Sequence, residues 1–121
     1  MYIKINRETE FRVWDKVEKR VILLGDLKEI SLWARIHPEI DFDERYEFMQ
    51  FTGLLDRGWK KIYEKDILKF EIMGYNEVGV IDFYDSGFWI KKPNGELHLP
   101  AKEYREIVGN VYENPDLVGK N

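Results

Sequence analysis

The residues most suggestive of chemistry form a short basic and aromatic loop. It contains Arg57, Trp59, Lys60 and Lys61, and a second group of the same kind follows further along the chain, made of Trp89, Lys91 and Lys92. Cations beside aromatic faces are used to bind single-stranded nucleic acid or polyproline peptides. The alternative is that both tryptophans lie in the core or at its rim and that the lysines keep strand edges soluble. If folding brings the two groups together, we expect a binding groove.

Residues for hydrolytic or metal chemistry are sparse. His37 stands before a proline and His98 on a predicted strand, and we expect both to be surface or packing histidines. Ser31 and Ser86 lack the sequence of a nucleophile elbow. The chain has no cysteine, which excludes disulfides and thiolate zinc sites. We therefore expect a protein without catalytic residues, metal or cofactor.

Other polar residues are expected to have structural roles. Asp41, Asp43 and Glu44 could offer oxygen ligands to a divalent cation, but they lack the spacing of a calcium loop, so we expect a solvated charged loop. Asp66 and Asn110 stand where a side chain can bond to neighbouring backbone amides and fix a turn.

Composition indicates a folded domain outside the membrane. The chain has 121 residues, of which 44% are hydrophobic, enough to form a core. Its net charge of -4 argues against a protein that binds nucleic acid by bulk attraction to phosphates. The N-terminal residues lack the apolar run of a signal peptide, and no later run is long enough to span a membrane. Together with the absence of cysteine, this favours the cytoplasm.

The N-terminal part, residues 1–45, is predicted to be a β-hairpin subdomain. Alternating polarity over 10–14 and the apolar run over 20–24 indicate two strands, with the hairpin ending at Gly25 and Asp26. Between Leu27 and Glu44 we expect a short strand or one helical turn followed by a loop, because Pro38 restricts the residue before it.

The remaining part, residues 46–121, is predicted to be a small β-barrel. Short strands separated by glycine turns, without long helices between them, indicate a mainly β fold. In the strand from Asp66 to Ile72, Leu68, Phe70 and Ile72 should share the buried face. Gly79 and Gly109 lie within predicted strands, where glycine marks a bend or a close backbone approach.

Several turns are also predicted. We expect Tyr63, Glu64 and Asp66 to set the turn that enters the barrel, and residues 85–87 to form a loop whose glycine supplies a bulge. A helical turn is expected over 101–106. Asn114, Pro115 and Gly119 suit the cap, first position and end of a last helical turn.

Three blocks of the chain resemble the signature blocks of the YopX family, in the same order. They are residues 11–16 (FRVWDK), residues 49–54 with 62–67 (MQFTGL and IYEKDI), and residues 108–117 (VGNVYENPDL). The resemblance implies a phage or prophage protein whose C-terminal part is an SH3-type barrel. It carries over no catalytic or binding residue, because the family has no established molecular activity.

One position departs from the family pattern. The family usually has glycine between the glutamate and the aspartate of the central block, where this chain has Lys65. If φ is positive there, Lys65 is mildly strained.

These observations lead to three hypotheses about function. The first is a non-enzymatic, cytoplasmic accessory module that binds a host or phage protein through the barrel and the N-terminal hairpin. The alternative is a nucleic-acid-binding barrel that uses the loop from Arg57 to Lys61. A small hydrolase or metal-dependent enzyme ranks last. Exposed strands and aromatic residues are also compatible with a homo-oligomer.

Overall fold

The computed structural model describes residues 10–25, 27–100 and 105–119, which form two compact units divided between Gly53 and Leu54. We call them unit 1 and unit 2. The sequence predicts a boundary between residues 45 and 46. The structural boundary lies later because the first half of β3 (Tyr46–Leu55) pairs with β1 (Phe11–Asp15) in unit 1.

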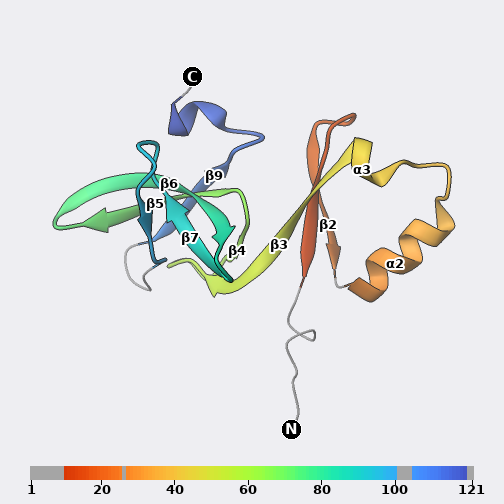
Figure 1. Ribbon diagram of the computed structural model, residues 1–121, viewed down its shortest axis with the longest axis horizontal. Helices are drawn as coiled ribbons and strands as arrows, with labels where there is room; N and C mark the ends of the chain where they lie inside the picture. The colour runs from red at the N-terminus through yellow and green to blue at the C-terminus, as the bar shows by residue number, and fades with distance from the viewer. Residues whose placement is uncertain (1–9, 26, 101–104, 120–121) are drawn as a thin grey trace, which may run out of the picture. The chain divides into compact units, whose positions relative to one another are not determined.

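Unit 1 is built on three antiparallel strands. β1 lies between β3 and β2 (Arg20–Gly25), with Trp14 opposite Val21 on one side and Glu47 on the other. Figure 1 shows the β1–β2 hairpin in red beside β3. Val13 and Met49 are fully buried. The predicted N-terminal hairpin is confirmed.

The segment after this hairpin is more helical than predicted. α2 (Leu27–Ile36) is a ten-residue helix, so the expectation of a short strand or one helical turn was wrong. Pro38 restricts only the residue before it, His37, and the helix ends one residue earlier, at Ile36. Trp33 of α2 then packs edge-on against Phe42, with ring centroids 5.0 Å apart.

The acidic cluster also differs from the expected loop. Phe42–Arg45 forms the short helix α3, and the Asp41 side chain accepts a hydrogen bond from the Glu44 amide at 3.3 Å. Asp41 is therefore the N-cap of α3, a position that favours aspartate. This role differs from both sequence-based interpretations of Asp41, as a cation ligand or as part of a solvated loop.

Unit 2 contains a curved five-stranded antiparallel sheet of order β8-β7-β6-β5-β9 (Figure 1). Its strands are β5 (Asp66–Ile72), β6 (Tyr75–Tyr84), β7 (Gly87–Lys91), β8 (Leu97–His98) and β9 (Glu106–Asn110). A separate short strand, β4 (Lys61–Tyr63), pairs with β3. The protein is therefore mainly β, with a curled half-barrel in unit 2, which confirms the predicted fold class.

Burial in β5 follows the predicted alternation. Leu68 and Phe70 are buried and Ile72 is half-buried, whereas Lys69 and Glu71 are exposed. Leu68 and Phe70 form the core of unit 2 together with Ile62, Ile81 and Ile90.

Both strand glycines stand at close approaches, as predicted. A Cβ on Gly79 would lie 2.5 Å from the Ile90 side chain and 2.9 Å from the Lys91 carbonyl oxygen. A Cβ on Gly109 would lie 2.9 Å from the Asn114 Cβ. A larger residue would therefore have to displace the Lys91 backbone at the first position and the Asn114 side chain at the second.

Two turns differ in detail from the prediction. Asp85 and Ser86 hold the positive φ angles of the β6–β7 turn, 47° and 66°, while Gly87 pairs with Tyr84 as the first residue of β7. Near the C-terminus, η1 (Pro115–Val118) is the expected helical turn, of 3-10 type, and Gly119 follows with φ of 88°. Asn114 makes no side-chain cap; its Oδ1 accepts from the Asn110 amide instead, at 3.1 Å.

The helical turn expected over 101–106 falls largely on residues outside those described, and β9 already begins at Glu106. Within the described ranges, no helix is both long and apolar enough to cross a bilayer.

Candidate functional site

The turn between β4 and β5 positions the central residue of the candidate site. Asp66, 1% exposed, accepts a hydrogen bond from the Tyr63 amide at 2.8 Å, which fixes the turn as predicted. Lys65 has φ of 71°. Its amide donates to the Ile81 carbonyl at 2.8 Å, and its carbonyl accepts from the Val111 amide at 3.0 Å. The backbone of Lys65 therefore joins β6 to the segment after β9.

The Lys65 side chain is held by an acidic residue of β6. Its Nζ lies 2.5 Å from Asp82 Oδ1. Burial acts to lower the pKa of Lys65, but the hydrogen bond and charge of Asp82 outweigh it, so the pKa lies above its ordinary value. Lys65 is thus a fixed cation.

Lys65 and Asp82 line a cavity of about 380 Å³ together with Lys91 and Lys92. Its remaining wall consists of apolar and aromatic side chains, from Val80, Pro93, Val111, Tyr112 and Val118. We call it the lysine cavity. It lies entirely within unit 2, between β6–β7, the β4–β5 turn and the segment that leads into η1.

An exposed face of the β6–β7 hairpin continues from this cavity. Val80 lies opposite Lys91, and Asp82 opposite Trp89, so these side chains share one face of the sheet. Tyr84 is two positions further along the same face. We call Val80, Asp82, Tyr84, Trp89 and Lys91 the β6–β7 face. The opposite face carries Ile81 and Ile90, which are fully buried.

Contacts within this face fix its aromatic end. The Trp89 Nε1 donates to the Tyr84 carbonyl at 3.2 Å. Lys91 Nζ donates to the Tyr84 hydroxyl at 3.3 Å and lies 5.8 Å from the centre of its ring. The partner of Lys91 is therefore a neutral group that stabilises a cation through its ring.

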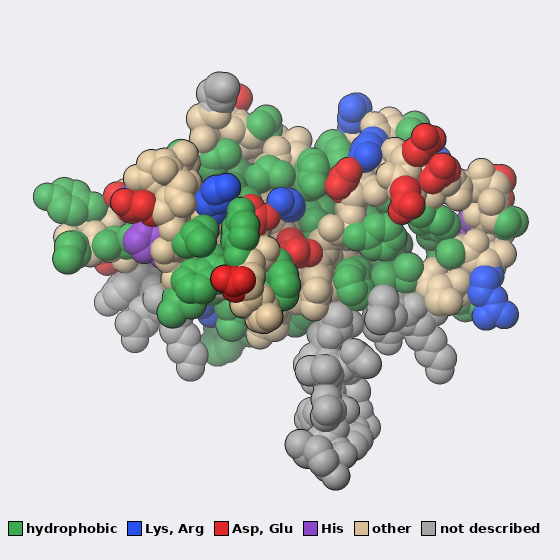
Figure 2. Space-filling model, in the orientation of Figure 1, with side chains coloured by type: hydrophobic (Ala, Val, Ile, Leu, Met, Phe, Trp, Pro, Cys, Tyr) green, Lys and Arg blue, Asp and Glu red, His purple; other side chains and the backbone are tan. Residues whose placement is uncertain are grey.

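Lys92 has acidic partners instead. Its Nζ lies 3.2 Å from Glu96 and 3.3 Å from Glu77. The hydrogen bond to Glu96 raises the pKa of Lys92, with Glu77 adding to the effect. Figure 2 shows the same mixture on the visible face of unit 2, where basic side chains lie among acidic and hydrophobic ones.

The basic loop predicted from the sequence lines a second cavity. Arg57 and Lys60 line a space of about 430 Å³ together with Asp56 and Glu106. Asp56 shapes this loop, since its Oδ1 accepts from the Gly58 and Lys60 amides at 2.8 and 2.9 Å. Burial acts to raise the pKa of Asp56, but these backbone hydrogen bonds lower it below its ordinary value.

Trp59 of this loop is 81% exposed, so it is not a core residue. Lys61 is exposed on β4 and lines neither of the two cavities described. The structure thus divides the predicted binding residues: Lys91 and Lys92 line one cavity, with Trp89 on the face beside it, and Arg57 and Lys60 line the other.

Sequence reasoning missed Asp82, Tyr112 and Lys65 as members of a site. Lys65 and Tyr112 stand in the second and third signature blocks, and this position in the blocks is the sequence feature that could have identified them as site residues. Asp82 gave none, because its role depends on the long-range pairing of β6 with the β4–β5 turn.

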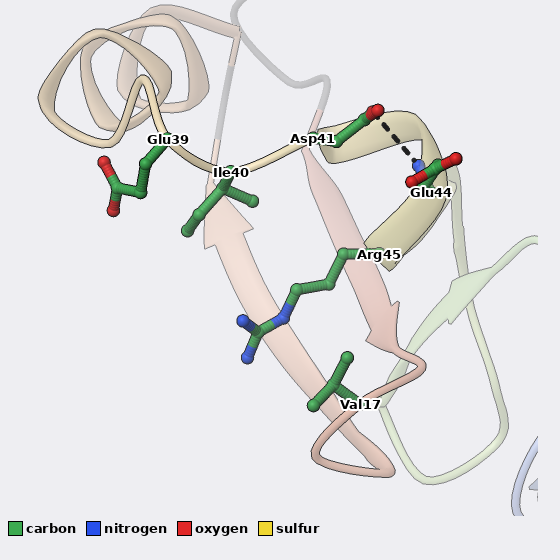
Figure 3. Close-up of a pocket in the computed structure, with 6 residues that line it drawn as sticks. All are labelled: Val17, Glu39, Ile40, Asp41, Glu44 and Arg45. Carbon is green, nitrogen blue, oxygen red and sulfur yellow. Dashed lines mark hydrogen bonds between the residues drawn. The ribbon is translucent and has the colours of Figure 1, made fainter.

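A third cavity, of about 590 Å³, lies in unit 1 and is drawn in Figure 3. Arg45 projects between Ile40 and Val17. Its guanidinium binds the buried Asp15 carboxylate through two hydrogen bonds of 3.1 and 3.0 Å. This cation is engaged in holding α3 to the hairpin, so we regard the cavity as a structural junction.

The histidines and acidic residues are placed as packing and capping groups. His37 packs on Trp33 and His98 on Phe70, with centroids 5.1 and 5.8 Å apart. Among the residues that the structure describes, no group of three or more His, Asp or Glu is arranged to hold a metal ion.

Comparison with known proteins identifies similar chains. The family model described as YopX protein matches residues 10–119. Protein EF1440 from Enterococcus faecalis is 19% identical, with a TM-score of 0.60, and the match covers 92% of this chain and 98% of that one. Protein yopX from Bacillus subtilis is 18% identical, with a TM-score of 0.53, covering 91% of this chain and 98% of its own. A comparison with curated proteins finds no match.

Proposed function

The chain belongs to the YopX protein family, and from this premise we propose that it is a non-enzymatic accessory protein of a phage or prophage. In this proposal it acts in the host cytoplasm by binding a host or phage protein. The observation that carries the proposal is the β6–β7 face, where Tyr84, Trp89 and Lys91 lie beside the lysine cavity. Aromatic rings that offer both an apolar body and a polar group are typical of protein interfaces.

Charge favours protein over nucleic acid as the ligand of this face. The chain has a net charge of -4. Lys91 is the one lysine of this face, and Lys65 and Lys92 of the adjoining lysine cavity are both paired with carboxylates. A phosphate backbone is bound by a row of available cations, which these residues do not supply.

Site-specific photocrosslinking in host cells tests the proposal. A photoreactive benzoylphenylalanine in place of Tyr84 should form an adduct with one protein, identified by mass spectrometry. The matched control puts the same group at Tyr75, which is 74% exposed at the other end of β6. Adducts at both positions or at neither would contradict the proposal. An adduct with a second copy of the chain would identify a homo-oligomer as the partner, which light scattering would check.

The basic loop supports a second candidate function, the binding of single-stranded nucleic acid. Trp59 is an exposed ring next to Lys60, and together with Arg57 it resembles a stacking platform with cations. Fluorescence anisotropy with oligonucleotides at low salt should then show binding that weakens as salt rises and that Trp59→Ala reduces. Absence of binding at low salt rejects this candidate.

A further inference from the structure

We propose that the lysine cavity binds the carboxylate of an acidic residue in an extended peptide, with a neighbouring apolar residue of the peptide against its apolar wall. This inference rests on the proposed protein-binding function and specifies its ligand. The charge of the cavity, its free hydrogen-bond donors and its apolar wall each favour such a peptide.

The charge that remains for a ligand comes from Lys91. The Lys65 ammonium is balanced by Asp82, and Lys92 is balanced by Glu77 and Glu96. Lys91 differs, because within the described part of the chain its Nζ bonds to the neutral Tyr84 hydroxyl and to no carboxylate. Together these three lysines and three carboxylates sum to zero, so the positive charge offered to a ligand is local and lies at the Lys91 ammonium.

Two lysines of the cavity retain hydrogen-bond donors. An ammonium group has three N–H donors and no acceptor. Asp82 holds Lys65 through one bond, and Tyr84 holds Lys91 through one, so both retain donors for a ligand. Because both ammonium groups are already anchored, little side-chain entropy is lost when a carboxylate binds.

The lining of the cavity favours a carboxylate over a phosphate. Asp82 lines the same cavity and would repel a doubly charged group more strongly than a singly charged one. Phosphate sites typically use arginine forks or clustered backbone amides. The lining here offers lysines and one acid, which suits a single carboxylate.

The apolar wall favours a peptide over a free anion. Val111, Val118 and Pro93 give the cavity an apolar side, and Tyr112 adds a ring. A free inorganic anion would leave this wall in contact with water. A peptide in which an acidic residue has an apolar neighbour would cover it, and the β6–β7 face would accommodate the adjoining residues towards Tyr84.

Selection from a random-sequence peptide library on the full-length protein tests this proposal. The enriched peptides should contain an acidic residue beside an apolar one. The strongest peptide, labelled with fluorescein, should bind about tenfold more weakly to Lys91→Ala, as expected for loss of one charge-assisted hydrogen bond. Lys19→Ala is the matched control, because Lys19 is an exposed lysine with positive φ in a turn of unit 1. It should leave binding unchanged.

A thermodynamic cycle makes the test specific. Replacing the peptide carboxylate by its amide should weaken binding to the wild type by about the same tenfold, and its effect should be clearly smaller with Lys91→Ala, where only Lys65 remains to donate. If the amide peptide binds the wild type equally well, the carboxylate inference is overturned while protein binding stands. If no peptide is enriched and Tyr84 forms no crosslink, the proposed function itself fails. Unchanged urea midpoints would exclude misfolding of the variants.

Discussion

Lys65 and Asp82 form an ion pair in which the lysine stands at a backbone position that favours glycine. Nζ and Oδ1 are 2.5 Å apart, and φ at Lys65 is 71°. The positive φ on which the expectation of a strained Lys65 depends is therefore present. The backbone conformation and the ion pair of Lys65 have opposite effects on the stability of the protein. The left-handed backbone costs a non-glycine residue about 1 kcal/mol, and the partly exposed ion pair returns about 1 kcal/mol or less.

Substitution of Lys65 separates these two effects. Lys65→Gly removes the strain together with the ion pair, so the free energy of unfolding should stay within about 1 kcal/mol of the wild type. Lys65→Ala keeps the strain and loses the pair, so it should be about 1 kcal/mol less stable than Lys65→Gly. Urea unfolding of both variants measures the difference. An alanine variant as stable as the glycine variant would show that the backbone here is unstrained.

Asp15 should make the stability of unit 1 depend on pH. Its hydrogen bonds to Arg45 lower its pKa from 3.8 to about 2, although burial opposes them. The native state therefore holds the carboxylate more strongly deprotonated than the unfolded chain does. The resulting stabilisation, on the order of 1–2 kcal/mol, is present above pH 3.8 and is lost as the pH falls towards 2.

Asp15→Asn provides the control for this pH effect. It removes the charge while keeping a side chain of the same size, so unit 1 should lose about 1–2 kcal/mol near neutral pH. The variant should also lose the part of the acid destabilisation that Asp15 causes. Hydrogen exchange of the Val17 and Glu18 amides, which donate to Asp15, reports on this unit alone. Equal slopes of stability against pH in both proteins would contradict the assignment.

Asn110 is the centre of the turn that leads into η1. Its Oδ1 accepts from the Tyr112 and Glu113 amides at 3.0 and 2.9 Å, and its Nδ2 donates to Glu113 Oε1 at 2.9 Å. Asn110→Asp keeps the acceptor but replaces the donor by a second carboxylate oxygen facing Glu113. Stability should fall by about 1–3 kcal/mol at neutral pH, because an attraction becomes a repulsion.

A second substitution identifies the cause. Adding Glu113→Gln should restore most of the stability that Asn110→Asp loses, since the new glutamine amide can donate to the carboxylate introduced by the first substitution. Differential scanning calorimetry of the two single variants and the double variant measures the interaction. Strictly additive losses would mean that Glu113 is not the partner that matters.

Most of the structure that could be predicted follows from residue types and their immediate neighbours in the sequence. The alternation in β5, the turn roles of Asp66 and Asn110 and the tight approach at Gly79 each depend on the residue type and its immediate neighbours. Such features can be derived from strand periodicity and side-chain hydrogen bonding alone. The N-terminal hairpin and the final helical turn could be predicted for the same reason.

The features that the sequence does not predict depend largely on contacts between distant parts of the chain. Pro38 argues against a long helix in the sequence, whereas Ile30 and Trp33 have helical spacing, and in the structure Trp33 packs against Phe42 of α3 and Tyr46 of β3. The predicted binding residues were divided because neither cavity is contiguous in sequence: Lys65 reaches Lys91 only through the pairing of β6 with β7. No local pattern contains that information.

Gly79 offers the most direct test of packing in the sheet of unit 2. Gly79→Ala would place a methyl group 2.5 Å from Ile90 and 2.9 Å from the Lys91 carbonyl oxygen, and the backbone atom cannot move without disturbing the β6–β7 ladder. We expect a loss of about 1–3 kcal/mol, the usual cost of overpacking. Gly87→Ala is the matched control in the same hairpin, because its new Cβ would meet its nearest atoms at 3.8 Å. It should change stability by less than about 0.5 kcal/mol, as an ordinary surface substitution does.

Chemical denaturation of both variants measures the two losses of stability. Similar losses would mean that the cost of Gly79→Ala does not come from the contact with Ile90 and Lys91.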